Sequence, residues 1–510
     1  MPYGKQVMFL QEVKLVFMFK PDLKEFLKLS KKGNVIPVYL EVNADLDTPV
    51  SAFLKIKQGD YSFLLESVEG QEKIARYSFL GTNPSLIFKS KGRQIEIIDV
   101  AKKKNRSFTI EGTPFDEIRK IMRDFRSVEL AGLPRFYGGL VGYIGYDTVR
   151  FFEKIPDKNK DALKIPDTLF ILTDTILIFD RLNHTLKIVS NVIIPKQSGV
   201  LKKKELYQQA IKKIGSIYSD FNRFIIQPKD SLGRAGKLSI SSNLRRPEFV
   251  DMVKKAKEYI RKGDVIQVVL SQRFKVKTQK DHFEIYRALR SLNPSPYMYY
   301  LKLKDFSIVG SSPEMLVRCE NGLVQTRPIA GTRRRGRNNQ EDARLEKELL
   351  ADEKEKAEHL MLVDLGRNDL GRISKLGKVK VDDFMRVEKY SHVMHLVSGV
   401  SAVLDKKRFD IYDVLKAAFP AGTVSGSPKI RAMEIIDELE NLRRSLYAGS
   451  IGYFSFSHNM DTCIAIRTIL LKDGFAYVQA GAGLVADSVP EKEYQESVNK
   501  ARAMMEAIRG

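Results

Sequence analysis

The sequence predicts an α+β fold, in which antiparallel β-sheets pack as a sandwich with helices on the outside. Two hairpin signals support the antiparallel sheets: Asn321-Gly322 and Asp473-Gly474 each separate two apolar runs. Amphipathic helical segments alternate with these strand-like runs along the chain. Hairpins join strands that run in opposite directions, so they favour antiparallel sheets over a doubly wound parallel sheet. The length allows two to three ordinary domains or two large interlocked ones.

The composition is that of a globular protein with a large core. The chain has 510 residues, of which 43% are hydrophobic and 29% charged. No apolar run approaches the roughly 18 residues that a membrane-spanning helix needs, so we expect no membrane partner. The two cysteines, Cys319 and Cys463, have neither CxxC nor zinc-site spacing. We therefore expect buried, structural thiols.

A net charge of +23 raises the question of nucleic-acid binding. The lysines are scattered, however, and they alternate with acids in helical segments such as 251–262 and 343–358. This pattern is typical of solvated, ion-paired helix faces. No zinc finger, RNA-binding signature or basic zipper is present, so we expect no nucleic-acid partner.

The first half of the chain reads as mixed α/β. Residues 1–20 form a possible N-terminal extension; they lack a cleavage site and predict a cytoplasmic rather than a secreted protein. Residues 61–70 predict a strand that ends in a polar turn. Residues 135–156 form a glycine-studded, strand-like run, and its glycines indicate close backbone approach or bulges. Residues 168–192 predict two strands around a turn near Asn183.

The second half follows a predicted linker at 227–237. The sequence therefore divides into regions 21–235 and 236–510. A helix is predicted over 246–264, followed by a β-rich run. The last helix carries a capping-box signature, with Ser488 as N-cap, Pro490 in the first turn and Glu491 three residues after the serine.

Two glycine-rich segments differ from common nucleotide-binding motifs. The segment 422–429 lacks the order of a phosphate-binding P-loop, although it leads into a helix with Pro428 near its start. The segment 481–486 follows a strand, but its helix begins too late for a dinucleotide fingerprint. Neither segment predicts a nucleotide site.

The loop PIAGTRRRG, at 328–336, combines backbone amides, a threonine and several guanidinium groups. Such a loop can hold a small anion through its N–H groups and through charge-assisted hydrogen bonds. The alternative is a solvated basic turn. The guanidinium groups in question are those of Arg327, Arg333, Arg334 and Arg335.

Three downstream segments change the balance between these alternatives: 357–372, 419–436 and 479–502. Together with the loop, and in this order, they resemble the chorismate-utilising enzymes, specifically the anthranilate synthase component I branch. The resemblance extends from about Val38 to Ala507. It implies two interlocked regions with an active-site cleft: tryptophan-binding elements in region 21–235 and a chorismate-binding catalytic region at 236–510.

The resemblance also implies roles for residues that are ambiguous when taken singly. Glu358 and Glu496 would otherwise be surface helix charges, and in this family acids at these positions hold a magnesium ion (Mg²⁺) that receives the ring carboxylate. The implied catalytic residues are His395, Glu314 and Thr423. The implied substrate-binding residues are Gly331, Thr332, Tyr447, Arg467, Gly481, Ala482, Gly483 and Lys500. The implied tryptophan-binding residues are Ser67, Pro296, Tyr297 and Met298.

Two positions indicate which reaction to expect within the family. Water-using relatives carry a lysine base where this chain has Gln267, and aminodeoxychorismate synthases typically carry lysine where it has Ala330. The resemblance therefore implies the conversion of chorismate and ammonia to anthranilate and pyruvate, with feedback inhibition by tryptophan. The alternatives are an aminodeoxychorismate synthase and a non-catalytic chorismate-binding protein.

The nitrogen source is expected to be a partner protein. The chain has no GxCxG-type nucleophile elbow, so it should not hydrolyse glutamine itself. We expect a separate glutamine amidotransferase subunit, the component II of such synthases, to supply the ammonia.

Overall fold

The computed structural model describes residues 19–56, 59–68, 76–223, 239–390 and 393–510. Residues 1–18 of the predicted extension, the predicted linker at 227–237 and the predicted boundary between 235 and 236 lie outside the described residues. Within the described residues, all pairings between named strands are antiparallel and form two sheets. The predicted α+β class with antiparallel sheets is therefore confirmed.

The first sheet is spread across both halves of the sequence. Its strands follow the order β1 (Phe19–Lys20), β2 (Val35–Asn43), β11 (Thr185–Ile193), β10 (Thr175–Asp180), β4 (Tyr77–Thr82), β3 (Tyr61–Glu66), β14 (Tyr297–Leu303), β15 (Phe306–Ser312), β24 (Thr468–Lys472), β25 (Phe475–Leu484), β13 (Gln267–Lys277) and β12 (Ile240–Ser242), with β21 (Gly426–Ser427) paired to β13.

The second sheet is also built from both halves. Its strands follow the order β18 (Ile329–Arg334), β20 (Val393–Leu404), β17 (Leu323–Thr326), β16 (Met315–Glu320), β23 (Met460–Ile464), β22 (Ser450–Ser455), β8 (Gly139–Ile144), β9 (Thr168–Thr173), β5 (Leu86–Lys91), β6 (Gln94–Asp99) and β7 (Lys104–Thr109), with β19 (Ser374–Lys389) paired to β20.

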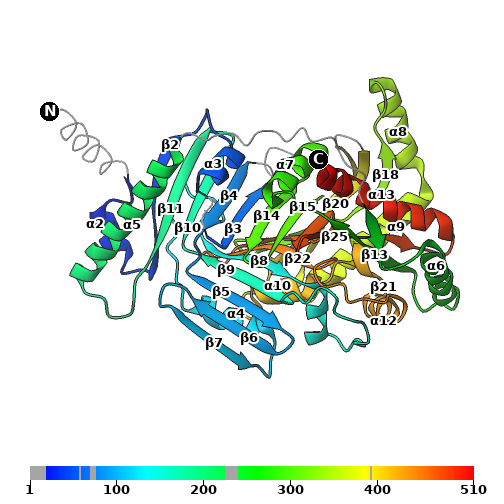
Figure 1. Cartoon of the computed structure of the whole chain (residues 1–510), viewed down its shortest axis with the longest axis horizontal. Helices are drawn as coiled ribbons and strands as arrows, with labels where there is room; N and C mark the ends of the chain where they lie inside the picture. The colour runs from blue at the N-terminus through cyan, green and yellow to red at the C-terminus, as the bar shows by residue number, and fades with distance from the viewer. Residues whose placement is uncertain (1–18, 57–58, 69–75, 224–238, 391–392) are drawn as a thin grey trace.

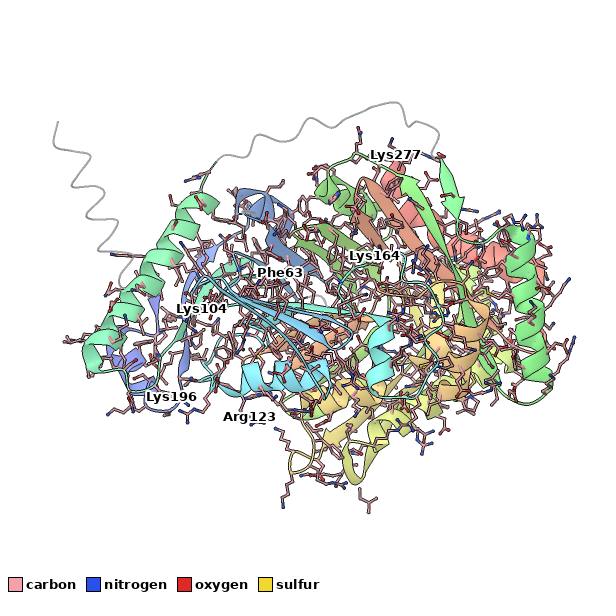
Figure 2. The ribbon with its side chains drawn as sticks, turned by 60° about the horizontal axis from the view of Figure 1, so that its bottom comes forward. Phe63, Lys104, Arg123, Lys164, Lys196 and Lys277 are labelled. Atoms are coloured by element: carbon pink, nitrogen blue, oxygen red, sulfur yellow. The ribbon has the colours of Figure 1, made fainter. Side chains whose placement is uncertain are left out.

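The two sheets pack face to face, and helices cover their outer faces (Figure 1). Alternate side chains of each strand point to the same face, so one set from each sheet fills the space between them. Phe63 and Tyr299 of the first sheet meet Tyr143 and Tyr453 of the second in this shared core. Figure 2 labels Phe63 inside the molecule.

The helices form two outer layers. They are α2 (Leu23–Leu29), α3 (Pro49–Ile56), α4 (Pro114–Arg123), the 3-10 helix η1 (Tyr146–Phe151), α5 (Val200–Phe221), α6 (Arg246–Arg261), α7 (His282–Leu292), α8 (Asn339–Ala351), α9 (Glu353–Gly371), α10 (Ile411–Ala418), α11 (Gly422–Ser425), α12 (Lys429–Leu439) and α13 (Pro490–Arg509). Among these, α3, α5, α7 and α13 pack on the first sheet, and α4, α9 and α10 pack on the second.

Two strand pairs join the halves of the chain. β3 pairs with β14, and β8 pairs with β22. On its other side β8 pairs with β9, and this close approach needs glycine at Gly142, since a Cβ there would lie 1.9 Å from the carbonyl oxygen of Leu169. The predicted interlocking is therefore present in both sheets.

Most local predictions are confirmed. Asn321-Gly322 joins β16 to β17 and Asp473-Gly474 joins β24 to β25, with both residues of each pair at positive φ, as two-residue hairpin turns require. The predicted helix over 246–264 is α6. The helix that follows Pro428 is α12, with Pro428 as its N-cap.

The prediction of two strands within 168–192 is wrong. The segment forms three strands, because the chain leaves the second sheet after β9 and enters the first sheet at β10. Asp174 lies at this crossing, and its carbonyl accepts from the backbone N–H of Asn191. An uninterrupted apolar run does not record such a change of sheet. The predicted turn near Asn183 does join β10 to β11.

The predicted N-cap of the last helix is also wrong. Val489 is the N-cap of α13, and Pro490 is its first residue. The Ser488 hydroxyl instead accepts from the backbone N–H of Val485. Ser488 therefore stabilises the turn before α13 and does not cap the helix.

The surface charge is spread over many elements. Figure 2 labels Lys104, Lys164, Lys196 and Lys277, which lie on different parts of the molecule.

Cys319 and Cys463 are both buried and free, as expected. Within the described residues, no helix combines the length and the hydrophobicity that crossing a bilayer requires.

Candidate active site

One face of the β13–β25 pair forms the floor of the candidate site. Because side chains alternate along a strand, Gln267, Ser271 and Arg273 share a face of β13. Gly483 and Gly481 of β25 lie on the same face, since Val269 pairs with Gly483 and Ser271 pairs with Gly481. The other face is apolar and packs under α6 and α12.

The glycines leave room for larger side chains of the site. A Cβ on Gly483 would lie 2.9 Å from Nε2 of Gln267, and one on Gly481 would lie 3.0 Å from the hydroxyl oxygen of Tyr447. Ala482 points to the opposite, buried face. β24 pairs with β25 only as far as Val478, so the segment from Gln479 to Leu484 extends beyond the end of β24.

Two helices bring the predicted metal-binding acids together. Glu358 comes from α9 and Glu496 from α13. Burial raises the pKa of Glu358, and the charges of Glu355 and Glu496 raise it further. The Gln267 amide, 3.3 Å from Oε1 of Glu358, and the Lys500 ammonium group lower it. The Lys500 ammonium lies 2.5 Å from the Glu496 carboxylate. Glu355, Glu358 and Glu496 therefore form a crowded acidic cluster, and the positive charge next to it is the ammonium group of Lys500.

Two further acids belong to this cluster and were not among the predicted site residues. Glu355 lies one helical turn before Glu358, and Glu493 lies one turn before Glu496. Burial raises the pKa of Glu493, and the charge of Glu496 adds to this effect. Their spacing of three residues from the predicted ligands is the signal that could have identified them.

The acid cluster fits a hard divalent cation. Carboxylates that raise one another's pKa are stabilised by a cation between them. In the described part of the chain, no three acid, histidine or cysteine side chains are arranged as a complete metal-binding set. A small ion with two carboxylate ligands, completed by substrate and water oxygens, matches this donor set.

Glu314 lies two residues after β15 and is buried beside α11. Burial raises the pKa of Glu314 to about 8, although the Thr423 hydroxyl and the Lys500 charge act in the opposite direction. Thr423 Oγ1 makes no hydrogen bond of ordinary geometry within the described residues. Glu314 is therefore protonated at neutral pH and can act as an acid.

His395 on β20 faces the predicted substrate loop. Its Nδ1 lies 3.0 Å from Oγ1 of Thr332 and 3.1 Å from the carbonyl oxygen of Gly331. Gly331 has φ +68° and lies where the β18–β20 register shifts, so the bulge turns Thr332 towards the histidine. The carbonyl is an acceptor, so Nδ1 carries the proton in the neutral ring and Nε2 can accept.

The charge state of His395 follows from its surroundings. Burial lowers the pKa of His395, the hydrogen bond to Gly331 raises it, and the charge of Arg467 lowers it. The imidazole is thus neutral near pH 7. The same interaction shows that His395 and Arg467 lie within electrostatic range of each other.

Arg467 connects the remaining predicted residues. It adopts φ +51°, and its Nη1 donates to the backbone carbonyl of Lys500. Burial lowers the pKa of Arg467, whereas Tyr447 and Glu496 raise it. The structure therefore brings together the predicted catalytic, substrate-binding and metal-binding residues from six elements and the turns beside them.

The expectation that the basic loop offers free guanidinium groups is wrong. Each of its arginines is paired with protein carboxylates: Arg327 with Glu388, Arg333 with Glu348, Asp352 and Glu355, Arg334 with Glu341, and Arg335 with Asp342. These pairs tie the loop to α8, α9 and β19. The charges serve the local fold, and the loop faces the site with Gly331 and Thr332.

The predicted tryptophan-binding residues form a separate group. Met298 pairs with Glu66 across β14 and β3, and the backbone N–H of Val68 donates to the carbonyl of Ser295, which places Ser67 beside the 296–298 segment. The Ser67 hydroxyl is buried and has no hydrogen-bond partner within the described residues. Tyr297 points the other way, with its hydroxyl 3.0 Å from Asp461.

A buried ionic cluster next to Ser67 was not foreseen. Glu66 is 4% exposed and accepts from Arg181, Arg290 and Tyr286. Arg181 also donates to the carbonyl of Ser67. Nothing in the sequence indicated this cluster beyond the position of Glu66 next to Ser67, because the partners of Glu66 come from distant segments.

The comparisons with known proteins agree with this site. The chorismate binding enzyme family matches residues 61–506. Anthranilate synthase component 1 of Acetivibrio thermocellus is 50% identical, over 96% of this chain and 99% of that protein, and its counterpart in Aquifex aeolicus is 51% identical, over 96% and 97%.

Solved structures also match. Anthranilate synthase component I from Streptococcus pneumoniae is 37% identical, with a TM-score of 0.75 over 91% of this chain and 98% of that chain. The menaquinone-specific isochorismate synthase from Escherichia coli shares the fold at 19% identity and a TM-score of 0.69. These matches confirm the resemblance noted in the sequence, and the chain belongs to the chorismate binding enzymes and, among them, to the anthranilate synthase component 1 proteins.

Proposed function

We propose that this chain converts chorismate and ammonia to anthranilate and pyruvate, the first step of tryptophan biosynthesis. The observation that carries the proposal is the presence of a protonated acid, Glu314, near Lys500 and of a neutral base, His395, near Arg467, which itself donates to the carbonyl of Lys500. Two titratable groups whose surroundings set opposite roles are typical of acid–base catalysis.

The site suits a substrate with two carboxylates. Arg467 and Tyr447 hold the enolpyruvyl carboxylate, for which a planar guanidinium is well shaped. Backbone N–H groups of Gly331 to Thr332 and of Gly481 to Gly483 contact the ring carboxylate. Lys500 lies within electrostatic range of both Glu314 and Glu358, so it balances charge at the centre of the site.

Magnesium is the metal that we assign to Glu358 and Glu496. When bound, Mg²⁺ supplies a fixed positive charge for the ring carboxylate. Glu355 and Glu493 lie one helical turn from these two acids and would add negative charge around a bound cation. Lys500 must leave Glu496 partly free for this arrangement, and its flexible side chain allows that.

In the first step, ammonia adds to C2 of the ring and the C4 hydroxyl leaves. A C–N bond forms, the ring double bonds shift, and the C4–O bond breaks. Glu314 gives its proton to the departing oxygen, which leaves as water, and the Thr423 hydroxyl lies beside that carboxyl group. The added nitrogen then loses a proton to the medium.

In the second step, pyruvate leaves and the ring becomes aromatic. His395 removes the proton from C2 with its free Nε2, and the C3–O bond to the enolpyruvyl group breaks. The released enolate takes up a proton at its methylene carbon and becomes pyruvate. Positioning and electrostatic stabilisation supply most of the rate.

The choice of nucleophile rests on Gln267. This neutral amide cannot remove a proton from water at neutral pH, whereas ammonia needs no such activation. Its buried Oε1 has no partner within the described residues. At position 330, buried Ala330 offers no amine to compete with ammonia, which favours anthranilate over the aminodeoxychorismate product.

Ammonia should come from a glutamine amidotransferase subunit in the cytoplasm, with free ammonium able to replace it. Tryptophan should inhibit through Ser67, Pro296, Tyr297 and Met298. The orphan hydroxyl of Ser67 supports a polar ligand there, because a buried hydroxyl without a partner costs roughly 1–3 kcal/mol.

The experiment is a turnover assay of the purified chain with chorismate, magnesium and ammonium chloride. Anthranilate is followed by its fluorescence and pyruvate by a coupled dehydrogenase. We expect the two products in a ratio of one to one, and none when ammonium is replaced by glutamine alone. Chorismate that binds without turnover would instead support a non-catalytic binding protein.

A further inference from the structure

Arg273 is a buried arginine that the proposed reaction does not use. It is 5% exposed and lies on the face of β13 that forms the floor of the site. Its Nη1 is buried and has no hydrogen-bond partner within the described residues. A buried guanidinium nitrogen without an acceptor is costly, so something outside the protein should accept from it.

The charge of Arg273 is not balanced by a bonded acid. Its Nε donates to Oε1 of Gln479, and its Nη2 donates to the carbonyls of Arg443 and Arg444. All three acceptors are neutral. Burial lowers the pKa of Arg273 to about 10, with Glu440 acting in the opposite direction. The guanidinium is therefore a stabilising charge for any anion that lies near it.

The nearby acid is already engaged. Glu440 accepts from Arg444 and from the backbone N–H and hydroxyl of Ser271. The Ser271 hydroxyl in turn accepts from Nε2 of Gln479, which fixes Oε1 of that amide towards Arg273. This chain of bonds holds the guanidinium in one position and leaves Nη1 free.

Arg273 is tied to the turn that carries Tyr447. The carbonyl of Arg444, which accepts from Nη2 of Arg273, also accepts from the backbone N–H of Tyr447 at 3.1 Å. The Tyr447 hydroxyl lies over Gly481. A change at Arg273 would therefore be felt by one of the two residues that we assign to the enolpyruvyl carboxylate.

A small cavity lies between these groups. Its volume is about 20 Å³, and its lining includes Arg273, Tyr447, Ala465, Thr468 and Gln479. Ala465 lies two residues before Arg467, and Gln479 lies two residues before Gly481. Tyr447 lines the cavity and also lies next to Gly481 of the candidate site, so it borders both. The cavity is large enough for one water molecule and too small for pyruvate.

We propose that this cavity holds one water molecule bound to Nη1 of Arg273, and that Arg273 is a positioning residue for the enolpyruvyl carboxylate of chorismate. This inference rests on the proposed function. Arg273 acts in two ways. Its Nη2 fixes the turn that carries Tyr447. Its positive charge, acting across the small cavity and its water molecule, stabilises the carboxylate next to Arg467.

The test compares Arg273→Gln and Arg273→Lys with the unmodified chain. In Arg273→Gln we expect the KM for chorismate to rise tenfold or more while kcat stays within threefold. Arg273→Lys should recover part of this loss, because it keeps the charge. Arg443→Gln is the control: the same turn carries it, it is paired with Asp157, and it should leave the KM within twofold.

A second readout separates positioning from a general loss of structure. By calorimetry, Arg273→Gln should weaken the binding of pyruvate tenfold and leave the binding of anthranilate within twofold, because only pyruvate occupies the enolpyruvyl side. If Arg273→Gln does not fold, Leu163→Phe, which adds a larger side chain to the lining of the cavity, should weaken pyruvate binding selectively.

A folded Arg273→Gln variant with an unchanged KM would overturn the inference, and so would equal weakening of both products. An unchanged affinity for pyruvate in Leu163→Phe would overturn the role of the water. The proposed function is tested separately by turnover of the unmodified chain, so the two can fail independently.

Discussion

At the scale of single residues, the acid–base division rests on burial. Glu314 and His395 both lose solvent, but burial disfavours the charged form of each, so the carboxyl keeps its proton and the imidazole lacks one. The same physical effect therefore prepares an acid and a base within one candidate site.

The first prediction concerns Glu314. Glu314→Gln keeps the shape and the burial but has no proton to give, so kcat should fall about 10²–10⁴-fold with little change in the KM for chorismate. Glu320→Gln is the control and should keep full activity, because Glu320 is the last residue of β16 and its side chain is 41% exposed. A Glu314→Gln variant with more than a tenth of normal kcat would show that the hydroxyl leaves without this acid.

The pH dependence follows from the same group. Glu314 is protonated below its pKa of about 8 and ionised above it. Activity that needs the acid should therefore decline as pH rises through about 8. The profile of Glu314→Gln should lack this limb, which a stopped assay over a pH series would reveal.

The sequence identified these residues by resemblance rather than by pattern. His395 lies in an apolar run and Glu358 in a charged helix, and each is ordinary in its local setting. The unpaired Nη1 of Arg273 and the role of Glu355 depend on contacts between distant segments. No local pattern records such contacts.

At the scale of elements, α9 and α13 form the metal end of the site. The carboxylates of Glu358 and Glu496 come from helices more than a hundred residues apart, and the charge of Glu496 raises the pKa of Glu358. In the proposed function, a cation bound between the two carboxylates would offset this repulsion.

The second prediction is that turnover requires magnesium through both helices. Glu358→Gln or Glu496→Gln should reduce kcat/KM by at least a hundredfold, and EDTA should abolish activity in the unmodified chain. Glu353→Gln, at the exposed start of α9, is the matched control. Full activity of Glu496→Gln, or activity that EDTA does not affect, would remove the metal from the account.

The third prediction concerns β3 and β14. Ser67→Ala or Met298→Thr should weaken tryptophan inhibition tenfold or more, a change of about 1.4 kcal/mol, and leave the KM for chorismate unchanged. Ser62→Ala is the control, because Ser62 is also on the β3 segment and also has a buried, unpartnered hydroxyl. Inhibition curves that coincide for all variants would place the inhibitor elsewhere.

The strand pair also connects the two sites. Tyr297 of β14 pairs with Ser312 of β15, and the Ser312 hydroxyl accepts from the backbone N–H of Glu314. A ligand that shifts the start of β14 would therefore also shift Ser312, which lies two residues before the proposed catalytic acid, Glu314. Hairpin patterns in the sequence predict pairs of neighbouring strands. They do not predict the pairing of β3 with β14, because these strands are far apart in the sequence.

At the scale of the whole molecule, the sheets belong to neither half alone. The sequence indicated antiparallel sheets and outer helices correctly, because hairpin turns and periodicity are local. It could not show that the chain changes sheets at Asp174, or how both sheets pass between the halves, because those arrangements depend on packing between distant strands.

The fourth prediction follows from the shared sheets. A fragment spanning 239–510 would expose the β14 edge that β3 covers and the β22 edge that β8 covers. Exposed long edges promote aggregation, so the fragment should be insoluble or lack a cooperative thermal transition. A soluble fragment with sharp melting would show that the C-terminal region folds independently.

The central claim is that the whole assembly directs ammonia to C2 of chorismate and then removes pyruvate. The most direct test is chromatography of the products formed by the unmodified chain from chorismate, ammonium and magnesium. We predict anthranilate and pyruvate, with negligible isochorismate. A dominant 4-amino-4-deoxychorismate peak, or a dominant hydroxylated product, would contradict the assignment built on Gln267 and Ala330.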